Sequence, residues 1–249
     1  MGDGRGGMVA EDDRRTVALA CRVLGHQGLA EDVLGHVSLR MGQERMLLRC
    51  RGPREAGLLF TTVEDVFDVD LDGRGQLGEW SVPNELPIHS EVLRARPDVD
   101  AVVHCHPPAV LAVGMAGLGL RPVFGAYNIP AARLALAGVP VYPRAVLIRR
   151  RDLGQEMVAA MGSAPVCLLR GHGVTTVGSG THAVAQAVVR ALNVEALARI
   201  TLQLAALGAD AADLSPAEVA ELPDLGEALN DLAVWRHHLA RLDHAGLGL

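Results

Sequence analysis

The chain has 249 residues, a formal net charge of −6 and 49% hydrophobic residues, but only 3% aromatic residues. This length and hydrophobic content predict one large domain with a buried core. The acidic charge leaves no basic footprint for nucleic acid or an anionic membrane, and so few aromatic rings exclude a stacking platform for single-stranded nucleic acid. No apolar run reaches membrane-spanning length, so we expect neither nucleic acid nor membrane as a partner.

The N-terminal segment is rich in Gly and Asp and lacks the apolar centre of an export signal. It predicts a mobile tail over residues 1–12, followed by a single domain over residues 13–249. Four isolated cysteines without CxxC spacing predict reduced, buried thiols. Together these features favour a cytoplasmic protein.

The first half of the chain predicts a helix followed by short strands. Apolar residues with helical spacing predict a helix over residues 14–27, which Gly28 closes. Period-two patterns and turn residues predict strands over residues 36–40, 45–50, 57–61 and 67–73. A second helix is predicted over residues 87–96, with Pro87 in its first turn and Pro97 just after its end.

In the second half, helices and strands alternate. Strands are predicted over residues 101–104, 145–150, 164–170 and 174–178. Helices are predicted over residues 108–117, 131–137, 152–161, 181–207 and 227–242, and Ser215 followed by Pro216 is a signal for another helix start. This alternation predicts one α/β domain in which flanking helices cover a mixed sheet.

Two histidines one residue apart end a predicted strand in the stretch VVHCHPP, residues 102–108. Side chains alternate along a strand, so His104 and His106 point to one face and Cys105 points to the other. The two prolines end the hydrogen-bonded ladder, so this face opens into a pocket. The alternative is a pair of core histidines that bond to backbone carbonyls.

His172 stands between two glycines in the stretch LLRGHGV. Gly171 and Gly173 permit unusual backbone angles and the close approach of other groups. A third histidine from a separate strand end completes a tridentate arrangement that is typical of zinc, with positions left open for Lewis-acid chemistry. The alternative is a histidine that only stabilises its turn.

Glu85 lies 19 residues before His104, just ahead of the helix predicted over residues 87–96. Its carboxylate has two readings: it caps that helix, or it completes the metal sphere and moves protons beside it. His89 follows one helical turn later and is expected near the site or facing solvent.

These residues together resemble the class II aldolase/adducin family, over about residues 14–207. The stretches NELPIHSEVLRARPDVDAVVHCHPP and LLRGHGVTTVG carry the resemblance. It implies an α/β/α fold around a mixed, largely antiparallel sheet. It also implies that His104, His106, His172 and Glu85 bind one divalent metal per subunit, with Glu85 as the acid/base. We expect Zn²⁺, with Mn²⁺, Fe²⁺ or Co²⁺ as alternatives.

The sequence departs from the sugar-phosphate members of this family in two turns. Their phosphate-binding turns have small polar residues, whereas here His36 occupies the usual asparagine position, and Pro83 and Asn84 precede the acid. Proline has no amide proton to donate to a phosphate. The chain therefore resembles members without the phosphate cradle, such as dihydroxyphthalate decarboxylase-like proteins.

A carboxylic acid is the substrate class that these departures favour. We expect His36, Ser38, Arg40 and Asn84 to bind it, since arginine recognises a carboxylate through two parallel hydrogen bonds. Arg49 and Arg51 are further cationic groups on the early strands. The alternative for the arginines is a solvated strand face.

The resemblance also implies an assembly. Family members form tetramers with active sites near subunit boundaries, so we expect a homotetramer. Tyr127 falls near the position of a proton-donating tyrosine in the aldolases and is a second candidate catalytic residue. His237 and His238 are candidates for reaching a neighbouring site, although an exposed helix is the simpler reading.

The leading hypothesis is a metal-dependent carbon–carbon lyase, either a decarboxylase or an aldolase. It acts on a non-phosphorylated hydroxy or aromatic acid through a metal-stabilised enolate. One alternative is a non-heme Fe(II) oxygenase on an aromatic acid in a natural-product pathway, although such enzymes typically use two histidines and one carboxylate. A weaker alternative is a non-catalytic, adducin-like scaffold.

Overall fold

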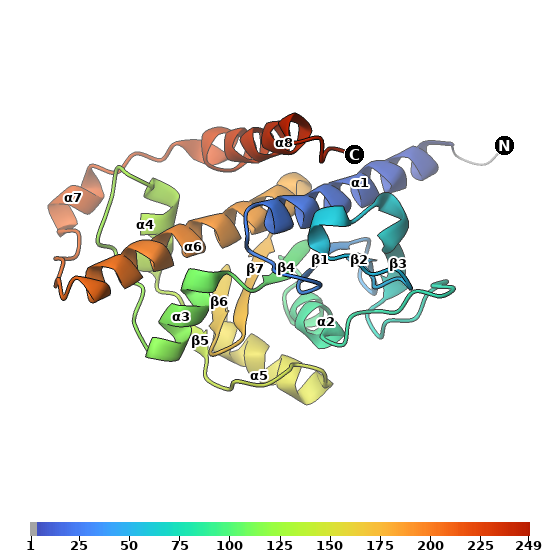
Figure 1. Ribbon diagram of the computed structural model, residues 1–249, viewed down its shortest axis with the longest axis horizontal. Helices are drawn as coiled ribbons and strands as arrows, with labels where there is room; N and C mark the ends of the chain where they lie inside the picture. Colours follow the sequence, from blue (N-terminus) through green and yellow to red (C-terminus); the bar gives the residue numbers. More distant parts are fainter. Residues whose placement is uncertain (1–3) are drawn as a thin grey trace.

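The computed structural model describes residues 4–249 and is built on one seven-stranded sheet (Figure 1). Its strand order is β3-β2-β1-β4-β7-β6-β5, and every neighbouring pair is antiparallel except β5 with β6. The strands are β1 (His36–Arg40), β2 (Arg45–Arg49), β3 (Val66–Asp70), β4 (Ala101–Cys105), β5 (Val141–Tyr142), β6 (Val166–Leu169) and β7 (Gly173–Gly178). The predicted mixed, largely antiparallel sheet is confirmed.

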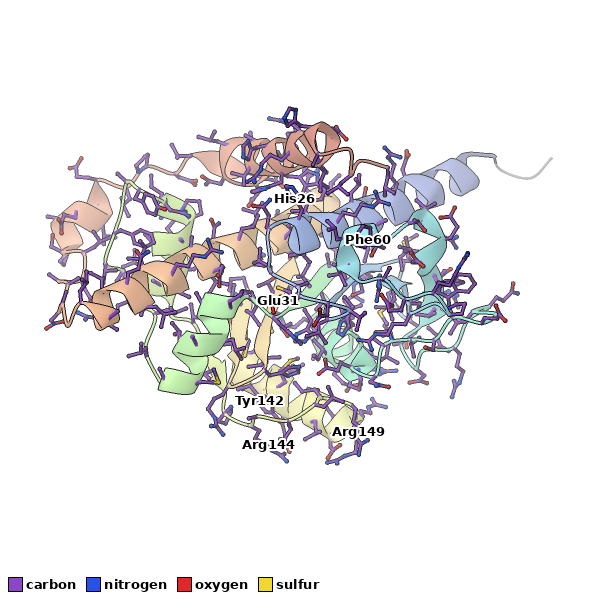
Figure 2. The ribbon with its side chains drawn as sticks, in the orientation of Figure 1. His26, Glu31, Phe60, Tyr142, Arg144 and Arg149 are labelled. Carbon is purple, nitrogen blue, oxygen red and sulfur yellow. The ribbon has the colours of Figure 1, made fainter. Side chains whose placement is uncertain are left out.

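Helices cover both faces of the sheet. The α-helices are α1 (Gly4–His26), α2 (Leu86–Ala95), α3 (Pro108–Ala116), α4 (Ile129–Ala137), α5 (Arg151–Met161), α6 (Ala183–Ala206), α7 (Pro216–Ala220) and α8 (Val234–His244). α1, α3 and α6 pack on one face, and α2 and α5 pack on the other (Figure 1). Figure 2 shows Tyr142 and Arg144 at the β5 edge, where both side chains donate hydrogen bonds to Glu156 of α5.

Strand alternation divides the core and determines which way the site faces. Val103 and Cys105 of β4 pack with α1 and α6, whereas Val102 packs with α2 and α5. Because neighbours along a strand face opposite ways, His104 shares the face of Val102 and points toward α2. His36 of β1 pairs in register with His104, so both imidazoles lie on this face.

Two predicted strands differ from the structure. Residues 57–61 hold a 3₁₀ turn, η1 (Leu58–Phe60), because Gly57 at φ +88° breaks the extended chain. Residues 145–150 form no strand: the parallel edge strand comes earlier, at β5, and the Ile148 amide bonds to a carboxylate outside the ladder.

The N-terminal boundary also differs. α1 begins at Gly4, so residues 4–12 continue the helix where the sequence predicted a tail. Helix-forming residues such as Met8, Ala10 and Glu11 extend the helix beyond its apolar stripe, which alone set the predicted start. The first three residues of that tail lie outside the described part of the chain.

Two expectations from the composition concern the cysteines and membrane-spanning helices. The four cysteines are free and buried, as predicted. Within residues 4–249, no helix is both long enough and apolar enough to cross a membrane. Three further 3₁₀ or π turns connect the elements: η2 (Val63–Asp65), η3 (Gly180–His182) and η4 (Ala228–Ala233).

Candidate metal centre

The four predicted metal ligands meet in one place. Glu85 directly precedes α2, His104 and His106 lie at the end of β4, and His172 lies in the turn between β6 and β7. One nitrogen or oxygen atom from each residue lies within 4.8 Å of the corresponding atom of every other. The fold therefore gathers three chain segments around a space of the size that one cation needs.

The distances between these atoms suit a shared ion. His106 Nε2 lies 2.9 Å from His104 Nε2, which in turn lies 3.5 Å from Glu85 Oε2. His172 Nε2 lies 3.1 Å from Glu85 Oε1. Ligand atoms about 2.0–2.1 Å from a tetrahedral metal are separated by roughly 3.4 Å, so these atoms are close to the spacing of a coordination shell.

The surroundings of the ring nitrogens of His104 and His172 indicate that these side chains are oriented as ligands. His104 Nδ1 lies 3.0 Å from the carbonyl oxygen of Val174, which only accepts hydrogen bonds, so Nδ1 carries the proton and the Nε2 lone pair faces the cluster. Both ring nitrogens of His172 are buried and make no hydrogen bond with the described residues, although Nε2 is within ion-pair distance of Glu85 Oε1. A buried nitrogen without a partner is costly unless a ligand satisfies it, so this donor set fits a divalent metal.

Local sequence explains how the ligands come so close. Pro107 and Pro108 end β4, and the His106 amide donates to the carbonyl of Leu29 instead of a neighbouring strand. Gly173 has φ +156°, and a Cβ at this position would lie 2.4 Å from the Cys105 carbonyl oxygen and 2.8 Å from His106 Cδ2. Only glycine lets the His172 turn approach His106 so closely.

Glu85 is turned toward the cluster, which decides between its two readings. It occupies the N-cap position of α2, but its side chain makes no capping hydrogen bond. Instead, Oε1 accepts a hydrogen bond from the Ile148 amide at 3.2 Å. The carboxylate is thus held by the segment before α5 and faces the imidazoles.

The protonation states favour metal binding. Burial, with smaller effects from His104 and His172, lowers the pKa of His106 to about 3, and burial also lowers the pKa of His104. Burial alone would raise the pKa of Glu85, but hydrogen bonds and attraction from His104 and His172 outweigh it and hold that pKa below its ordinary value. The site therefore offers neutral imidazoles at His104 and His106 and an ionised carboxylate at Glu85.

A second group of polar residues lies behind the four ligands. His36 Nδ1 bonds to His89 Nε2 at 2.7 Å, and His89 Nδ1 bonds to Ser38 Oγ at 2.7 Å. All three residues are buried, and His36 Nε2 lies 3.9 Å from Glu85 Oε2. His36 is thus beside the cluster, whereas Ser38 reaches it only through His89.

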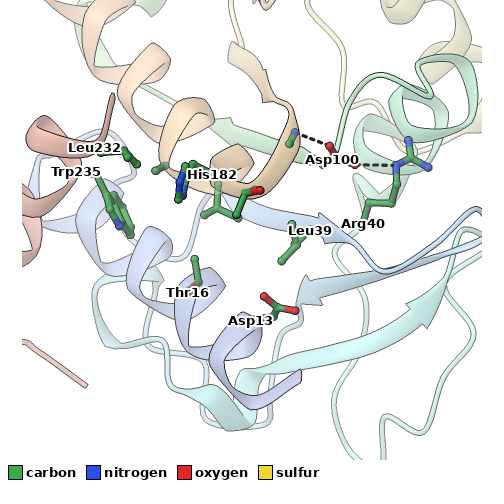
Figure 3. Close-up of a pocket in the computed structure, with 12 residues that line it drawn as sticks. Asp13, Thr16, Leu39, Arg40, Asp100, His182, Leu232 and Trp235 are labelled. Atoms are coloured by element: carbon green, nitrogen blue, oxygen red, sulfur yellow. Dashed lines mark hydrogen bonds and ion pairs between the residues drawn. The ribbon is translucent and has the colours of Figure 1, made fainter. Parts of the chain in front are cut away.

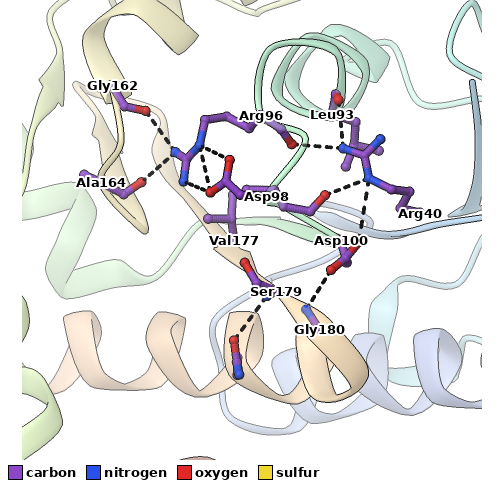
Figure 4. A network of polar contacts seen from close by, with 12 residues as sticks. Arg40, Leu93, Arg96, Asp98, Asp100, Gly162, Ala164, Val177, Ser179 and Gly180 are labelled. Carbon is purple, nitrogen blue, oxygen red and sulfur yellow. Dashed lines mark hydrogen bonds and ion pairs between the residues drawn. The ribbon is translucent and has the colours of Figure 1, made fainter. Parts of the chain in front are cut away.

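The structure does not bring Arg40 to the cluster. Arg40 ends β1, about 13 Å along the strand from His36 at 3.3 Å per residue. Its guanidinium donates to the carbonyls of Leu93, Arg96 and Val99, as Figure 4 shows in part. These bonds use its Nε and Nη2 donors to fix the loop before β4, and its position at the far end of β1 does not fit the predicted role in substrate binding.

A cavity of about 460 Å³ lies at this other end of β1 (Figure 3). Arg40, Asp100, His182 and Trp235 are among its lining residues, and none of the four metal-ligand candidates is. Asp100 accepts a hydrogen bond from the Gly180 amide and lies 3.8 Å from Arg40. Asp100 thus links Arg40 of β1 to the start of η3, and the cavity lies apart from the four gathered residues.

Other predicted site residues stay outside the cluster within one subunit. Tyr127 is 72% exposed and contacts Phe124, and with His237 and His238 it lines a cavity beside α8. Asn84 is exposed next to Glu85, with no side-chain hydrogen bond among the described residues. The roles of Tyr127, Asn84 and the two C-terminal histidines stay predictions.

Two contributors to the site are backbone groups: the Ile148 amide and the Val174 carbonyl. No residue type marks a backbone group as functional, so sequence reasoning had no signal for either. His89 had a signal, because it lies one helical turn after Glu85, but its partners on β1 became evident only from the fold.

Comparisons with known proteins agree with this geometry. Residues 15–202 match the family model described as Class II Aldolase and Adducin N-terminal domain. The chain is 54% identical to 3,4-dihydroxyphthalate decarboxylase from Arthrobacter keyseri, covering 93% of this chain and 94% of that protein. It is 48% identical to the Rhodococcus jostii protein of the same name, covering 93% and 96%.

A solved structure supports the fold. L-fuculose 1-phosphate aldolase from Glaciozyma antarctica matches with a TM-score of 0.76 at 17% identity, covering 98% of this chain and 95% of that chain. The prediction of an enzyme of the lyase class is confirmed by the family and by the names of the two decarboxylase relatives. The chain belongs to the class II aldolase and adducin family.

Proposed function

We propose that this chain is a divalent-metal-dependent decarboxylase of a dihydroxylated aromatic dicarboxylic acid, with 3,4-dihydroxyphthalate as the candidate substrate. The gathered cluster of Glu85, His104, His106 and His172 carries the proposal. The 54% identity to a decarboxylase named for this substrate supports the choice of substrate. Buried Pro83, which has no amide proton, also favours a substrate without phosphate.

The cluster has the donor types that zinc accepts, namely imidazole nitrogens and a carboxylate oxygen. Zn²⁺ is therefore the proposed metal, and Mn²⁺, Fe²⁺ and Co²⁺ accept the same donors. The bound metal would supply a Lewis acid for the negative charge that develops on substrate oxygens.

Glu85 is the residue that moves the proton. Its carboxylate is ionised, so it takes the proton of a substrate hydroxyl and leaves a phenolate. It then gives that proton to the ring carbon that carries the departing carboxylate. The carbon–carbon bond breaks, its electron pair returns to the ring and the phenolate oxygen, and carbon dioxide leaves. The products are carbon dioxide and the phenolate of a dihydroxybenzoate, so atoms and charge balance.

The assembly and location are further proposals. Family resemblance supports a homotetramer with active sites near its interfaces, and the composition supports a cytoplasmic location. In such a tetramer, the exposed Tyr127 belongs to a surface that a neighbouring copy covers. Light scattering that gives a monomer mass of 26.2 kDa would contradict the tetramer.

Metal-reconstituted protein tests the function directly. Protein purified without chelator is analysed for metal, stripped, reloaded with Zn²⁺, Mn²⁺, Fe²⁺ or Co²⁺, and given 3,4-dihydroxyphthalate. We expect stoichiometric carbon dioxide and dihydroxybenzoate, no oxygen uptake, and loss of activity after stripping. Glu85→Gln is expected to bind metal and lower kcat by about 10²–10⁴-fold, the usual contribution of a general acid/base.

Each rival function gives a different result. Oxygen uptake coupled to substrate loss with Fe²⁺ alone would favour the oxygenase, and cleavage of hydroxy acids to aldehydes would favour the aldolase. A protein that binds no metal and releases no carbon dioxide would contradict the proposal and favour a scaffold.

A further inference from the structure

Arg51 is a cation beside the site whose donors are mostly unused. Its Nε is buried and has no hydrogen-bond partner among the described residues, and its Nη2 makes one long bond, 3.3 Å, to the carbonyl of Val33. No carboxylate of the described chain lies within ion-pair distance of it, whereas Arg49, two residues earlier, pairs with Glu55. A guanidinium that is partly buried without an anion calls for one from a ligand.

The backbone fixes Arg51 next to the residues of the site. Its amide and carbonyl exchange two hydrogen bonds of 2.9 Å with Ser81, four residues before Glu85. Its bond to Val33 places the guanidinium beside the segment that enters β1 at His36.

The hydrogen bonds of Ser38 and His89 determine which ring nitrogen of His36 carries the proton. The Ser38 hydroxyl has one partner among the described residues, His89 Nδ1, so it must donate there or leave its own proton unsatisfied in the core. His89 then carries its proton on Nε2 and donates to His36 Nδ1. His36 must therefore carry its proton on Nε2.

This tautomer explains why His36 stands apart from the metal ligands. The protonated Nε2 has no lone pair for a metal, and it faces the cluster 3.9 Å from Glu85 Oε2 without a hydrogen bond. The His36 Nε2–H thus faces the cluster, and the Arg51 guanidinium lies against Val33, in the segment that leads into His36. Together they have the chemistry that recognises a carboxylate.

We propose that Arg51 and the Nε2–H of His36 form a subsite that binds the carboxylate the substrate keeps. This inference rests on the proposed function and deepens it. The retained carboxylate follows from charge: the departing group becomes neutral carbon dioxide, so an arginine on it would stabilise the ground state more than the transition state. An arginine on the retained group binds substrate, transition state and product alike.

The experiment compares four variants with the zinc-loaded wild type. Arg51→Gln removes the charge, and Arg51→Lys keeps the charge without the planar fork. His36→Leu removes the N–H donor, and His36→Gln retains one. Arg54→Gln is the matched control, because Arg54 is an exposed arginine of the same loop whose side chain makes no hydrogen bond or ion pair with the described residues. Circular dichroism verifies that each variant folds.

The readouts are KM and kcat for 3,4-dihydroxyphthalate, inhibition by the dihydroxybenzoate product, and calorimetric binding of phthalate and of inorganic phosphate. Arg51→Gln is expected to raise KM and weaken both phthalate and product by about 10–100-fold, the range of a charge-assisted bidentate contact. kcat is expected to stay within about threefold, as for uniform binding. His36→Leu weakens the same ligands by about 5–10-fold, His36→Gln restores part of that loss, and Arg54→Gln stays near wild type.

Three results would overturn the subsite: unchanged phthalate affinity in Arg51→Gln, product inhibition that the substitution leaves untouched, or phosphate that binds more tightly than phthalate. A lower kcat at constant KM would also contradict it. The proposed function and the subsite can also fail separately. If the wild type binds phthalate but releases no carbon dioxide, and Arg51→Gln no longer binds phthalate, the proposed function fails and the carboxylate subsite stands.

Discussion

The two ends of β1 both carry polar side chains, but they differ in how many hydrogen bonds remain to be made. At the His36 end, His172 has two buried nitrogens without partners, and Arg51 has one. At the Arg40 end, the guanidinium already donates to three backbone carbonyls. Buried polar groups that the fold leaves unsatisfied indicate a ligand, whereas groups that the fold satisfies stabilise the chain.

The largest difference between the two ends is expected when a histidine is removed from each. His172→Ala takes a ligand from the metal, and we expect loss of bound metal and a fall in kcat/KM on the order of 10³-fold, because the Lewis acid supplies several kcal/mol. His182→Ala, in the cavity at the Arg40 end, is the control and should keep both within twofold. Metal analysis and steady-state kinetics measure both variants. Equal losses of metal and of kcat/KM in the two variants would contradict the distinction between the two ends of β1.

Glycines give a second comparison, which concerns stability. An alanine at Gly173 would need both a glycine-only backbone angle and space that the Cys105 carbonyl and His106 occupy. We expect Gly173→Ala to lower the free energy of unfolding by about 3 kcal/mol or more and to weaken metal binding. Gly180→Ala, at φ +71° with nothing within 4 Å of the new Cβ, should cost about 1 kcal/mol. Urea unfolding measures both variants. Equal losses of unfolding free energy would mean that the backbone at Gly173 is not tightly packed against Cys105 and His106.

The sequence predicted that His104, His106 and His172 would gather because each of them depends on local geometry, whereas the place of Glu85 was implied by the family resemblance. HxH before proline forces two imidazoles to one face whatever the rest of the chain does, and GHG marks a turn that needs glycine. The periodic helices and strands were predicted for the same reason. β1 was correct over residues 36–40, and α2 was displaced by one residue at each end.

The sequence could not distinguish Arg40 from Arg51. Both are arginines on short early strands, and their difference lies in partners that the chain supplies from elsewhere. Carbonyls of the α2 end and the following loop reach Arg40, but no carboxylate in the described part of the chain reaches Arg51. The strand predicted over residues 145–150 was wrong for a similar reason: its β-branched residues suit a strand, but the Ile148 amide is used by Glu85.

Arg40→Gln sharpens the comparison with Arg51→Gln. Because Arg40 bonds to carbonyls that hold the loop before β4, its removal is expected to destabilise the fold by about 2–3 kcal/mol. KM for the substrate should stay within twofold, in contrast to the substitution at Arg51. Chemical denaturation and steady-state kinetics measure the two effects, and a KM increase without loss of stability would return Arg40 to the substrate site.

The smallest expected effect concerns the pH dependence of stability and His89, which lies between Ser38 and His36 in the buried hydrogen-bonded series. Burial lowers the pKa of His89 to about 3, from 6.5 for an ordinary histidine. The unfolded chain therefore binds a proton that the folded chain does not accept, and stability falls as pH decreases from about 6.5 toward 3. For metal-free protein, this one group is expected to remove roughly 1–2 kcal/mol of unfolding free energy between pH 6.5 and pH 5. His89→Phe should be less stable at pH 6.5, because Ser38 and His36 lose their partner, but it should lose less stability than the wild type on acidification. Denaturant unfolding at both pH values measures the difference, and an equal loss in the two proteins would mean that His89 takes up its proton in the folded state.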